Sequence, residues 1–302
     1  MAEYKGSILE TVGETPLVRI NRFNPYPRVN IYAKLEGLNP LGSVKERIAV
    51  SMVEGAEKEG VLTKDKIILE ASSGNTGIGL AMLGAVKGYK VTITMSRGVS
   101  KERRKLLKAM GAKIILTPAE KGTDGAIDKA DEIYAAQPDK YCRLNQYTSK
   151  YNPLIHYQTT GPEIWRQTGG KIDIFVVGLG TTGTIMGAGQ YLRERNPNLK
   201  IIAVEPQAGH HQEGLRNMTT ARVPPIFVWS IFYENIVVSD TDAYASTRQL
   251  ALVEGIFAGI SSGTAIWAAL QVAAKVKDKE MVVIFPDRGE KYLSLGKLFG
   301  PR

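Results

Sequence analysis

Residues 174–187, IFVVGLGTTGTIMG, read as a buried strand that runs into a glycine-rich turn and then into a helix. Gly178, Gly180 and Gly183 have the G-x-G-x-x-G spacing typical of a turn that binds a dinucleotide pyrophosphate. Glu205 ends the next apparent strand, where dinucleotide-binding proteins place the acid that binds the ribose. The glycines and threonines of this turn suit a single phosphate equally well, so the spacing alone leaves both ligands open.

Further short runs of apolar and β-branched residues flank this unit, and helical patterns separate most of them. Continuous apolar strands joined by crossover helices predict parallel sheets with helices on both faces. The polar segment NQYTSKYNP (145–153) predicts a junction between two such sets near residue 150, and residues 206–234 are expected to form an ordered loop with a short helix. The predicted strands are 31–36, 66–70, 90–95, 112–117, 141–145, 173–179, 200–205, 235–239 and 281–286.

The composition predicts an ordered globular protein, with 302 residues, 43% hydrophobic and 23% charged. The net charge of +9 is spread along amphipathic segments such as Lys101–Lys108, so we expect a solvated basic exterior and no nucleic-acid partner. Cys142 stands alone in the apolar YCRL and is expected to be buried, which fits a reducing compartment. The N-terminus resembles no secretory signal and no apolar run reaches membrane-spanning length, so we expect a cytoplasmic protein with no membrane partner. The histidines lack zinc-site spacing, and no metal is predicted.

The segment NPLGSVKERIA (39–49) predicts the start of a helix, because Ser43 and Glu46 have the spacing of a capping box. Lys45 then lies in the first helical turn, where the helix dipole disfavours a positive charge. This position suits a lysine that acts as a neutral amine or forms a Schiff base. Taken alone, however, the segment favours an exposed lysine on an amphipathic helix.

Two other segments predict turns at helix N-termini. Ser72–Thr76 follows a strand and offers backbone N–H groups and hydroxyls to an anion, although an ordinary capped glycine turn would look the same. Ser261 and Ser262, in GIFAGISSGTA (255–265), are placed to cap the helix that follows.

Together and in this order, NPLGSVKERIA, EASSGNTGIGLA, GLGTTGTIMG and GIFAGISSGTA resemble the fold-type II pyridoxal-phosphate enzymes, and most of all the cysteine synthases. TTGPEIW (159–165) and DRGEKYLSLG (287–296) are similar to the isozyme B-type branch. The resemblance runs from Thr15 to Leu298. It implies two three-layer αβα domains with mostly parallel sheets, as in the tryptophan synthase β-like fold, and a homodimer. The smaller, mobile domain would be 38–149, and 1–37 plus 150–302 would form the larger one.

The resemblance also implies a role for each motif. Lys45 would carry pyridoxal 5′-phosphate as an internal aldimine, Asn75 would bind the 3′-oxygen of the ring, and Ser261 would face the pyridine nitrogen. The cofactor phosphate would be bound by Gly180, Thr181, Thr182, Gly183 and Thr184. The substrate carboxylate would be bound by Ser72, Ser73, Gly74, Thr76 and Gln146. On this interpretation the opening turn holds one phosphate, and Glu205 is only the end of a strand.

The implied reaction is a β-replacement that makes L-cysteine. Serine beside the ring nitrogen makes the cofactor a weaker electron sink than aspartate would, which favours β-elimination over transamination. Lys45 would remove the α-proton as general base. The β-substituent would leave, and sulfide or thiosulfate would add to the resulting aminoacrylate. Ser96 and Val99 stand where the family often has Pro and Met, and Ser72 replaces the more usual Thr; none of these changes removes a catalytic group.

The activated serine is left open between O-acetyl-L-serine and O-phospho-L-serine. Arg216, in EGLRNM, would lie near the mouth of the site and suits a phosphate leaving group, with Arg222 as a second candidate. A surface arginine that pairs with Glu213 is the alternative. Cystathionine β-synthase-like, diaminopropionate-forming and cysteine desulfhydrase activities also stay open, as do an NAD-dependent oxidoreductase and a non-enzymatic relative of the same fold.

Overall fold

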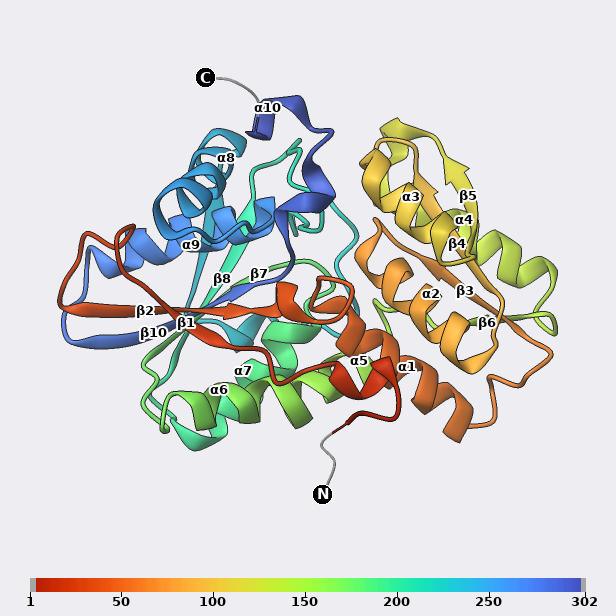
Figure 1. Cartoon of the computed structure of the whole chain (residues 1–302), viewed down its shortest axis with the longest axis horizontal. Coiled ribbons are helices and arrows are strands. Elements are labelled where there is room, and N and C mark those ends of the chain that lie inside the picture. Colours follow the sequence, from red (N-terminus) through yellow and green to blue (C-terminus); the bar gives the residue numbers. More distant parts are fainter. Residues whose placement is uncertain (1–3, 300–302) are drawn as a thin grey trace.

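The computed structural model describes residues 4–299, which form two sheets that stand side by side (Figure 1). The larger sheet has the strand order β1-β2-β10-β7-β8-β9, and the smaller has the order β5-β4-β3-β6. Every pairing is parallel except β1 with β2. The larger sheet contains β1 (Leu17–Ile20), β2 (Val29–Leu35), β7 (Ile174–Gly178), β8 (Lys200–Pro206), β9 (Glu234–Val238) and β10 (Lys279–Phe285). The smaller contains β3 (Ile67–Ala71), β4 (Val91–Ser96), β5 (Lys113–Thr117) and β6 (Tyr141–Arg143).

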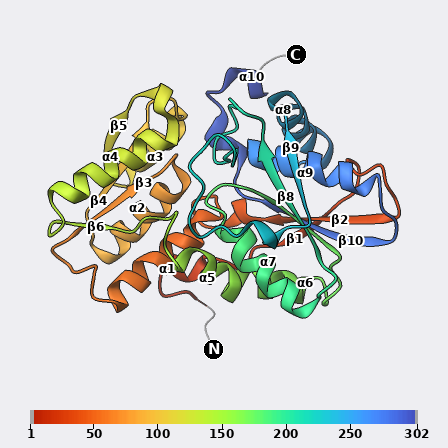
Figure 2. The same ribbon diagram turned by 180° about the vertical axis from the view of Figure 1, so that it is seen from behind.

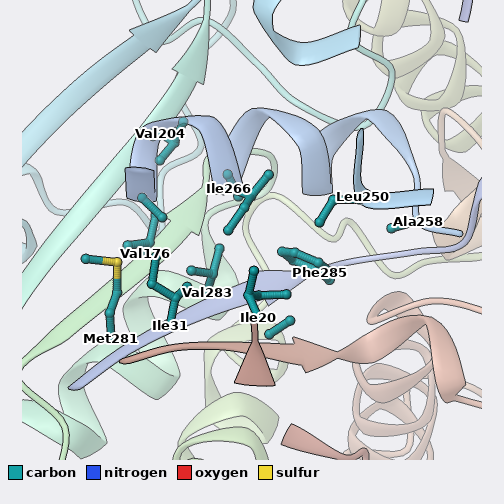
Figure 3. Close-up of a cluster of buried hydrophobic side chains, with 14 of the residues drawn as sticks. Ile20, Ile31, Val176, Val204, Leu250, Ala258, Ile266, Met281, Val283 and Phe285 are labelled. Carbon is teal, nitrogen blue, oxygen red and sulfur yellow. The ribbon is translucent and has the colours of Figure 1, made fainter. Parts of the chain in front are cut away.

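Helices cover both faces of the larger sheet. One face packs against α9 (Ile260–Ala273), and Ile266 of this helix lies over Val176 and Val283 of the sheet (Figure 3). The other face, which includes Phe175, packs against α7 (Gly183–Arg195) and α6 (Gly161–Gln167). Because successive side chains of a strand point to opposite faces, Phe175 and Val176 belong to different cores. α8 (Asp240–Gln249), α10 (Gly296–Phe299) and the π-helical turn Leu250–Glu254 complete the layer beside α9.

The smaller sheet is also covered on both sides, as is visible from behind in Figure 2. Ile68 of β3 packs with α1 (Lys45–Lys58), α2 (Asn75–Lys87) and α3 (Lys101–Ala109), whereas its neighbour Leu69 packs with α4 (Gly122–Ala136). The architecture of two three-layer αβα units is therefore confirmed. Short 3-10 turns occupy Ile8–Thr11, Glu36–Leu38, Ala119–Lys121, Trp229–Ile231 and Gly289–Tyr292.

Helices α1 and α5 (Tyr151–Ile155) lie where the two halves meet (Figures 1 and 2). The helix of α5 continues through a π-helical stretch, His156–Thr160, into α6. A buried ion network fixes α1 to the larger half: Arg47 of α1 binds Glu36 and Glu163, and Lys34 of β2 also binds Glu163. The helix that begins at Lys45 is thus anchored within its first turn.

The predicted strands are confirmed to within a few residues at their ends, and the loop 206–234 contains the expected short helix, Trp229–Ile231. β1 was not predicted, because it has only four residues, of which only Ile20 is buried. Cys142 is buried, as expected. Within residues 4–299, no helix is both long and apolar enough to cross a bilayer.

Candidate active site

A pocket opens between the two sheets, at the carboxyl ends of β3, β6, β7 and β10. Ligands of open α/β sheets commonly bind in this crevice, because loops from several strands converge there. The predicted site residues that line the pocket are Lys45, Ser72, Ser73, Asn75, Thr76, Gln146, Gly180, Thr181, Thr184, Arg216 and Ser261. Gly74, Thr182 and Gly183 lie in the same turns but do not line it. The pocket also has lining residues that were not predicted as site residues, including Tyr147, Glu213, Asp287 and Tyr292.

Lys45 is the first residue of α1 and its Nζ lies 3.4 Å from the hydroxyl of Thr181, across the pocket. Burial lowers the pKa of Lys45 to about 8, against a smaller opposing effect of Asp287. About a tenth of this amine is therefore uncharged at pH 7, far more than for a solvated lysine, and the uncharged amine is the form that makes a Schiff base.

The capping box predicted before Lys45 is only half formed. The Glu46 carboxylate accepts a hydrogen bond from the Ser43 backbone N–H at 2.8 Å, as in a capping box. The Ser43 hydroxyl, however, accepts from the backbone N–H of Lys45 at 3.3 Å, and the cap position falls on Val44. The helix consequently starts one residue later than the Ser43 cap implied.

The glycine turn after β7 leads directly into the N-terminus of α7. Thr182 has φ +68°, a left-handed conformation that is uncommon for a β-branched residue. Two glycines are sterically required: a Cβ on Gly180 would lie 2.6 Å from the Gly214 carbonyl oxygen, and one on Gly183 would lie 1.8 Å from Asn152 Oδ1. The turn therefore presents backbone N–H groups and threonine hydroxyls at a helix N-terminus, where the helix dipole favours an anion.

A second layer of polar side chains, which was not predicted from the sequence, stands behind this turn. Asn152 donates its amide to the Thr181 hydroxyl at 2.9 Å, and Nε2 of His156 lies 3.2 Å from the Thr184 hydroxyl. Burial, together with Arg47 and Lys45, lowers the pKa of His156 well below its ordinary value, so this ring is neutral. Both residues come from the helical stretch 151–167, which no local pattern connects to the glycine turn.

The loop after β3 carries the predicted carboxylate-binding group. The Ser72 hydroxyl accepts hydrogen bonds from the backbone N–H groups of Gly74 and Gly77, which holds the turn at the N-terminus of α2. Gly74 has φ +136°, a conformation that residues with a side chain rarely adopt. Gln146 accepts from the Thr76 hydroxyl at 2.6 Å and donates to the Ala71 carbonyl, so its second amide N–H remains to serve a ligand.

Ser261 lines the pocket from the first turn of α9, but the expected serine caps are wrong. Gly259 occupies the cap position, and both Ser261 and Ser262 lie inside the helix. Ser262 is fully buried, and its hydroxyl has no hydrogen-bond partner within the described residues.

Arg216 is 6% exposed and lines the pocket from the loop between β8 and β9. It pairs with Asp124 of α4 at 2.5 Å and not with Glu213, so the surface pairing considered for it is wrong. Its Nε and Nη1 have no hydrogen-bond acceptor among the residues that the structure describes. Arg222 is half exposed, pairs with Asp128 and does not line the pocket.

Arg103 is fully buried, although its segment was read as part of a basic exterior. It ion-pairs with Glu213 and with Asp287, and it donates to the Tyr292 hydroxyl at 2.6 Å. Tyr292 also donates to Asp287 at 2.7 Å. This cluster joins α3 of the smaller half to two loops of the larger half at the edge of the pocket.

Glu205 is buried. Its carboxylate accepts from the backbone N–H of Met218 at 2.7 Å and from the Asn235 amide at 2.8 Å. Both oxygens are thus engaged inside the protein, and neither serves as a ribose ligand.

The residues of the pocket fit pyridoxal phosphate, which holds an amine-reactive aldehyde, a ring and a phosphate. A buried lysine of lowered pKa faces a phosphate-type turn, and polar groups from α2 and α9 lie on other sides. Within the described residues, no group of three His, Cys, Asp or Glu side chains is arranged to hold a metal ion.

Comparisons with known proteins agree with this geometry. The family described as pyridoxal-phosphate dependent enzyme matches residues 8–287. The chain is 47% identical to a cysteine synthase of Aquifex aeolicus, over 95% of this chain and 90% of that one. It is 44% identical to cysteine synthase B of Escherichia coli, over 96% and 95%. The crystal structure of O-acetyl serine sulfhydrylase isoform 3 from Entamoeba histolytica superposes with a TM-score of 0.90 at 38% identity, over 98% of this chain and 92% of that one.

Proposed function

The chain belongs to the pyridoxal-phosphate dependent enzyme family, in its cysteine synthase branch, and from that premise we propose that it makes L-cysteine from O-acetyl-L-serine and sulfide or thiosulfate. The proposal rests on the position of Lys45, which faces the glycine turn across one pocket. Burial lowers the pKa of Lys45 to about 8. The names of the relatives supply the substrate class, and the described residues supply groups suited to each part of the reaction.

We assign the cofactor contacts as follows. The turn at the N-terminus of α7 would hold the phosphate, through Gly180, Thr181, Thr182, Gly183 and Thr184. Thr182 and Gly183 do not line the pocket, so their part would be to shape the turn and to offer backbone N–H groups. Asn75 would bind the ring oxygen, and Ser261 would face the ring nitrogen. When bound, the cofactor withdraws electrons from the α-carbon of an amino acid joined to it.

The protein's own groups then have three tasks. The loop Ser72–Thr76 and the free amide N–H of Gln146 would hold the substrate carboxylate at the N-terminus of α2. Lys45, uncharged in part at neutral pH, would take the proton from the α-carbon and later return it. The buried cluster of Arg103, Glu213 and Asp287 would close one side of the pocket and exclude water from it.

A second donor, O-phospho-L-serine, is favoured by one observation. Arg216 is buried and lines the pocket, and two of its nitrogen atoms lack acceptors within the described residues. A guanidinium edge with free N–H groups matches the oxygens of a phosphate leaving group. An acetyl group offers only neutral oxygens, so binding of O-acetyl-L-serine should depend less on the Arg216 guanidinium.

Spectral titration tests both donors. Cofactor-loaded protein would receive O-acetyl-L-serine or O-phospho-L-serine separately, and the change in its absorption band would be followed before sulfide is added and cysteine is measured. We expect a spectral change and cysteine formation with O-acetyl-L-serine, and no cysteine formation in Lys45→Ala, which lacks the base that removes the α-proton. Cofactor binding without any response to either serine derivative would contradict the proposal.

Arg216→Ala distinguishes the donors. Loss of hydrogen bonds between charged groups costs about 1.5–3 kcal/mol each, so kcat/KM for O-phospho-L-serine should fall roughly 10- to 100-fold, with little change for the acetyl donor. Arg222→Ala is the matched control, because Arg222 pairs with Asp128 outside the pocket. An equal loss with both donors, or no loss, would remove this role from Arg216.

The family also supports three broader proposals. We propose that the protein is a homodimer, that it works in the cytoplasm, and that residues 38–149 move as a unit against residues 1–37 and 150–302. Small-angle scattering with and without a donor would detect both the dimer and the closure. A monomeric particle, or an unchanged radius of gyration on donor binding, would count against the corresponding proposal.

A further inference from the structure

The side-chain amide of Asn75 lies between a lysine and an aspartate. Lys291, from the 3-10 turn Gly289–Tyr292, donates its Nζ to Asn75 Oδ1 at 3.0 Å. On the other side, Asn75 Nδ2 donates to Asp287 Oδ2 at 2.7 Å. Asn75 is the first residue of α2 and lines the pocket.

These two partners fix which end of the amide is oxygen and which is nitrogen. A lysine ammonium only donates hydrogen bonds, and an ionised carboxylate only accepts them. The reversed amide would place N–H against ammonium and oxygen against carboxylate, so both contacts would be repulsive. Asp287 takes one of the two amide N–H groups, and the other remains for a ligand in the pocket.

Lys291 is itself held firmly. It is 4% exposed, and its Nζ also donates to the Gly42 carbonyl at 3.0 Å. Burial lowers the pKa of Lys291 to about 8, partly offset by Asp287, so the side chain is mostly an ammonium at neutral pH. It does not line the pocket, and its effect on a ligand must pass through Asn75.

We propose that Lys291 is a positioning residue that orients the Asn75 amide so that an N–H group, and not the carbonyl oxygen, faces the cofactor ring. This inference rests on the proposed placement of the cofactor ring beside Asn75. The ring carries a phenolic oxygen, which accepts hydrogen bonds and would be repelled by an amide oxygen. A correctly oriented amide therefore contributes to cofactor affinity and to the absorption of the bound ring.

The first measurement compares Lys291→Met with Lys291→Arg and with the control Lys279→Met. Lys279 forms a half-exposed pair with Asp173, away from the pocket. We expect Lys291→Met to raise the dissociation constant of pyridoxal phosphate about 10-fold, equivalent to roughly 1.4 kcal/mol, and to shift its absorption maximum. Lys291→Arg, which keeps a donor, should recover most of the affinity, and Lys279→Met should match the wild type.

A double-mutant cycle separates this role from a purely structural one. If Lys291 acts through Asn75, Lys291→Met should have little further effect on cofactor affinity in an Asn75→Ala background. If Lys291 acts only by holding Gly42, the two effects will add, and the inference is overturned. Lys291→Leu, which also lacks a donor, serves for the cycle if circular dichroism shows that the methionine variant does not fold.

The controls also distinguish the inference from the proposed function. A wild-type protein that binds no pyridoxal phosphate would overturn the proposed function. A wild type that binds the cofactor, together with a Lys291→Met variant that matches Lys279→Met in affinity and spectrum, would overturn the role of Lys291 alone.

Discussion

Replacement of Arg47 by methionine tests whether the buried ion network holds α1 to the larger half. Arg47 is 1% exposed and donates to the carboxylates of Glu36 and Glu163 over distances of 2.7–2.9 Å. Burial raises the pKa of Glu36, but Arg47, together with Lys34 and a hydrogen bond from Thr15, outweighs burial and keeps that pKa below its ordinary value. Methionine would fill a similar volume and leave both carboxylates with Lys34 as their remaining buried cation.

The expected loss is large because the partners stay charged and buried. Breaking a buried pair by removing one side costs about 3–5 kcal/mol, whereas an exposed pair contributes about 0–1 kcal/mol. Arg28→Met is the matched control, since Arg28 pairs with Asp278 and both are more than half exposed. Urea unfolding followed by circular dichroism, with equal concentrations of cofactor, should give Arg47→Met a free energy of unfolding lower by about 3–5 kcal/mol.

The pH dependence gives a second check. The lowered pKa values of Glu36 and Glu163 stabilise the folded wild type above the unfolded carboxyl pKa, and this contribution is lost as the pH falls through the folded values. The variant lacks it, so the difference between the two proteins should shrink as the pH falls below about 4.5. A variant that loses no more free energy than Arg28→Met at neutral pH would refute the reasoning.

Three other outcomes follow from the pocket. Borohydride reduction of the cofactor-loaded protein, followed by peptide mass spectrometry, should label Lys45 and not Lys291, although burial lowers both pKa values to about 8; label on Lys291 would contradict the assignment. Because the neutral amine reacts and the pKa of Lys45 is lowered, the rate of cofactor incorporation into stripped protein should rise with pH to a half-maximum near 8; stopped-flow absorbance would detect a midpoint near 10 instead if the lysine were solvated. Gly183→Ala should weaken cofactor binding about 10-fold, equivalent to roughly 1.4 kcal/mol, because the new Cβ would lie 1.8 Å from Asn152 Oδ1. Gly98→Ala is the control and should bind the cofactor normally, because its Cβ would have its nearest neighbour at 3.6 Å. Equal dissociation constants for the two variants would show that the turn tolerates the side chain.

The fold could be predicted from the sequence because buried parallel strands carry their own signal. Both faces of β7 are covered, so IFVVG is apolar throughout and stands out from its surroundings. β1 was not predicted because it is a short edge strand in which only Ile20 is buried. The helix starts were predicted less accurately than the strands. Ser43 and Ser261 look like N-caps in the sequence, but the N-cap positions are occupied by Val44 and Gly259.

The site was predicted to the extent that its residues lie in glycine-rich turns. Lys45, Asn75 and Thr181 belong to local motifs, and the structure brings them to one pocket. Asp287 and His156 lie in no such motif. Asp287 contacts Asn75 and Arg103, both more than a hundred residues away in the sequence, and His156 contacts Thr184 of another helix. Spacing along the chain cannot reveal a hydrogen bond that exists only after two halves of the protein have packed together.

The inward-facing carboxylate of Glu205 has a consequence for redesign. It anchors the loop that carries Arg216, through the Met218 backbone N–H, and it steadies Asn235 at the start of the neighbouring strand. An engineer who wished to convert this glycine turn to nicotinamide chemistry would have to release that acid for a sugar hydroxyl. The same change would release the segment that carries Arg216, for which we propose a contact with the leaving group, so the two chemistries would compete for one side chain.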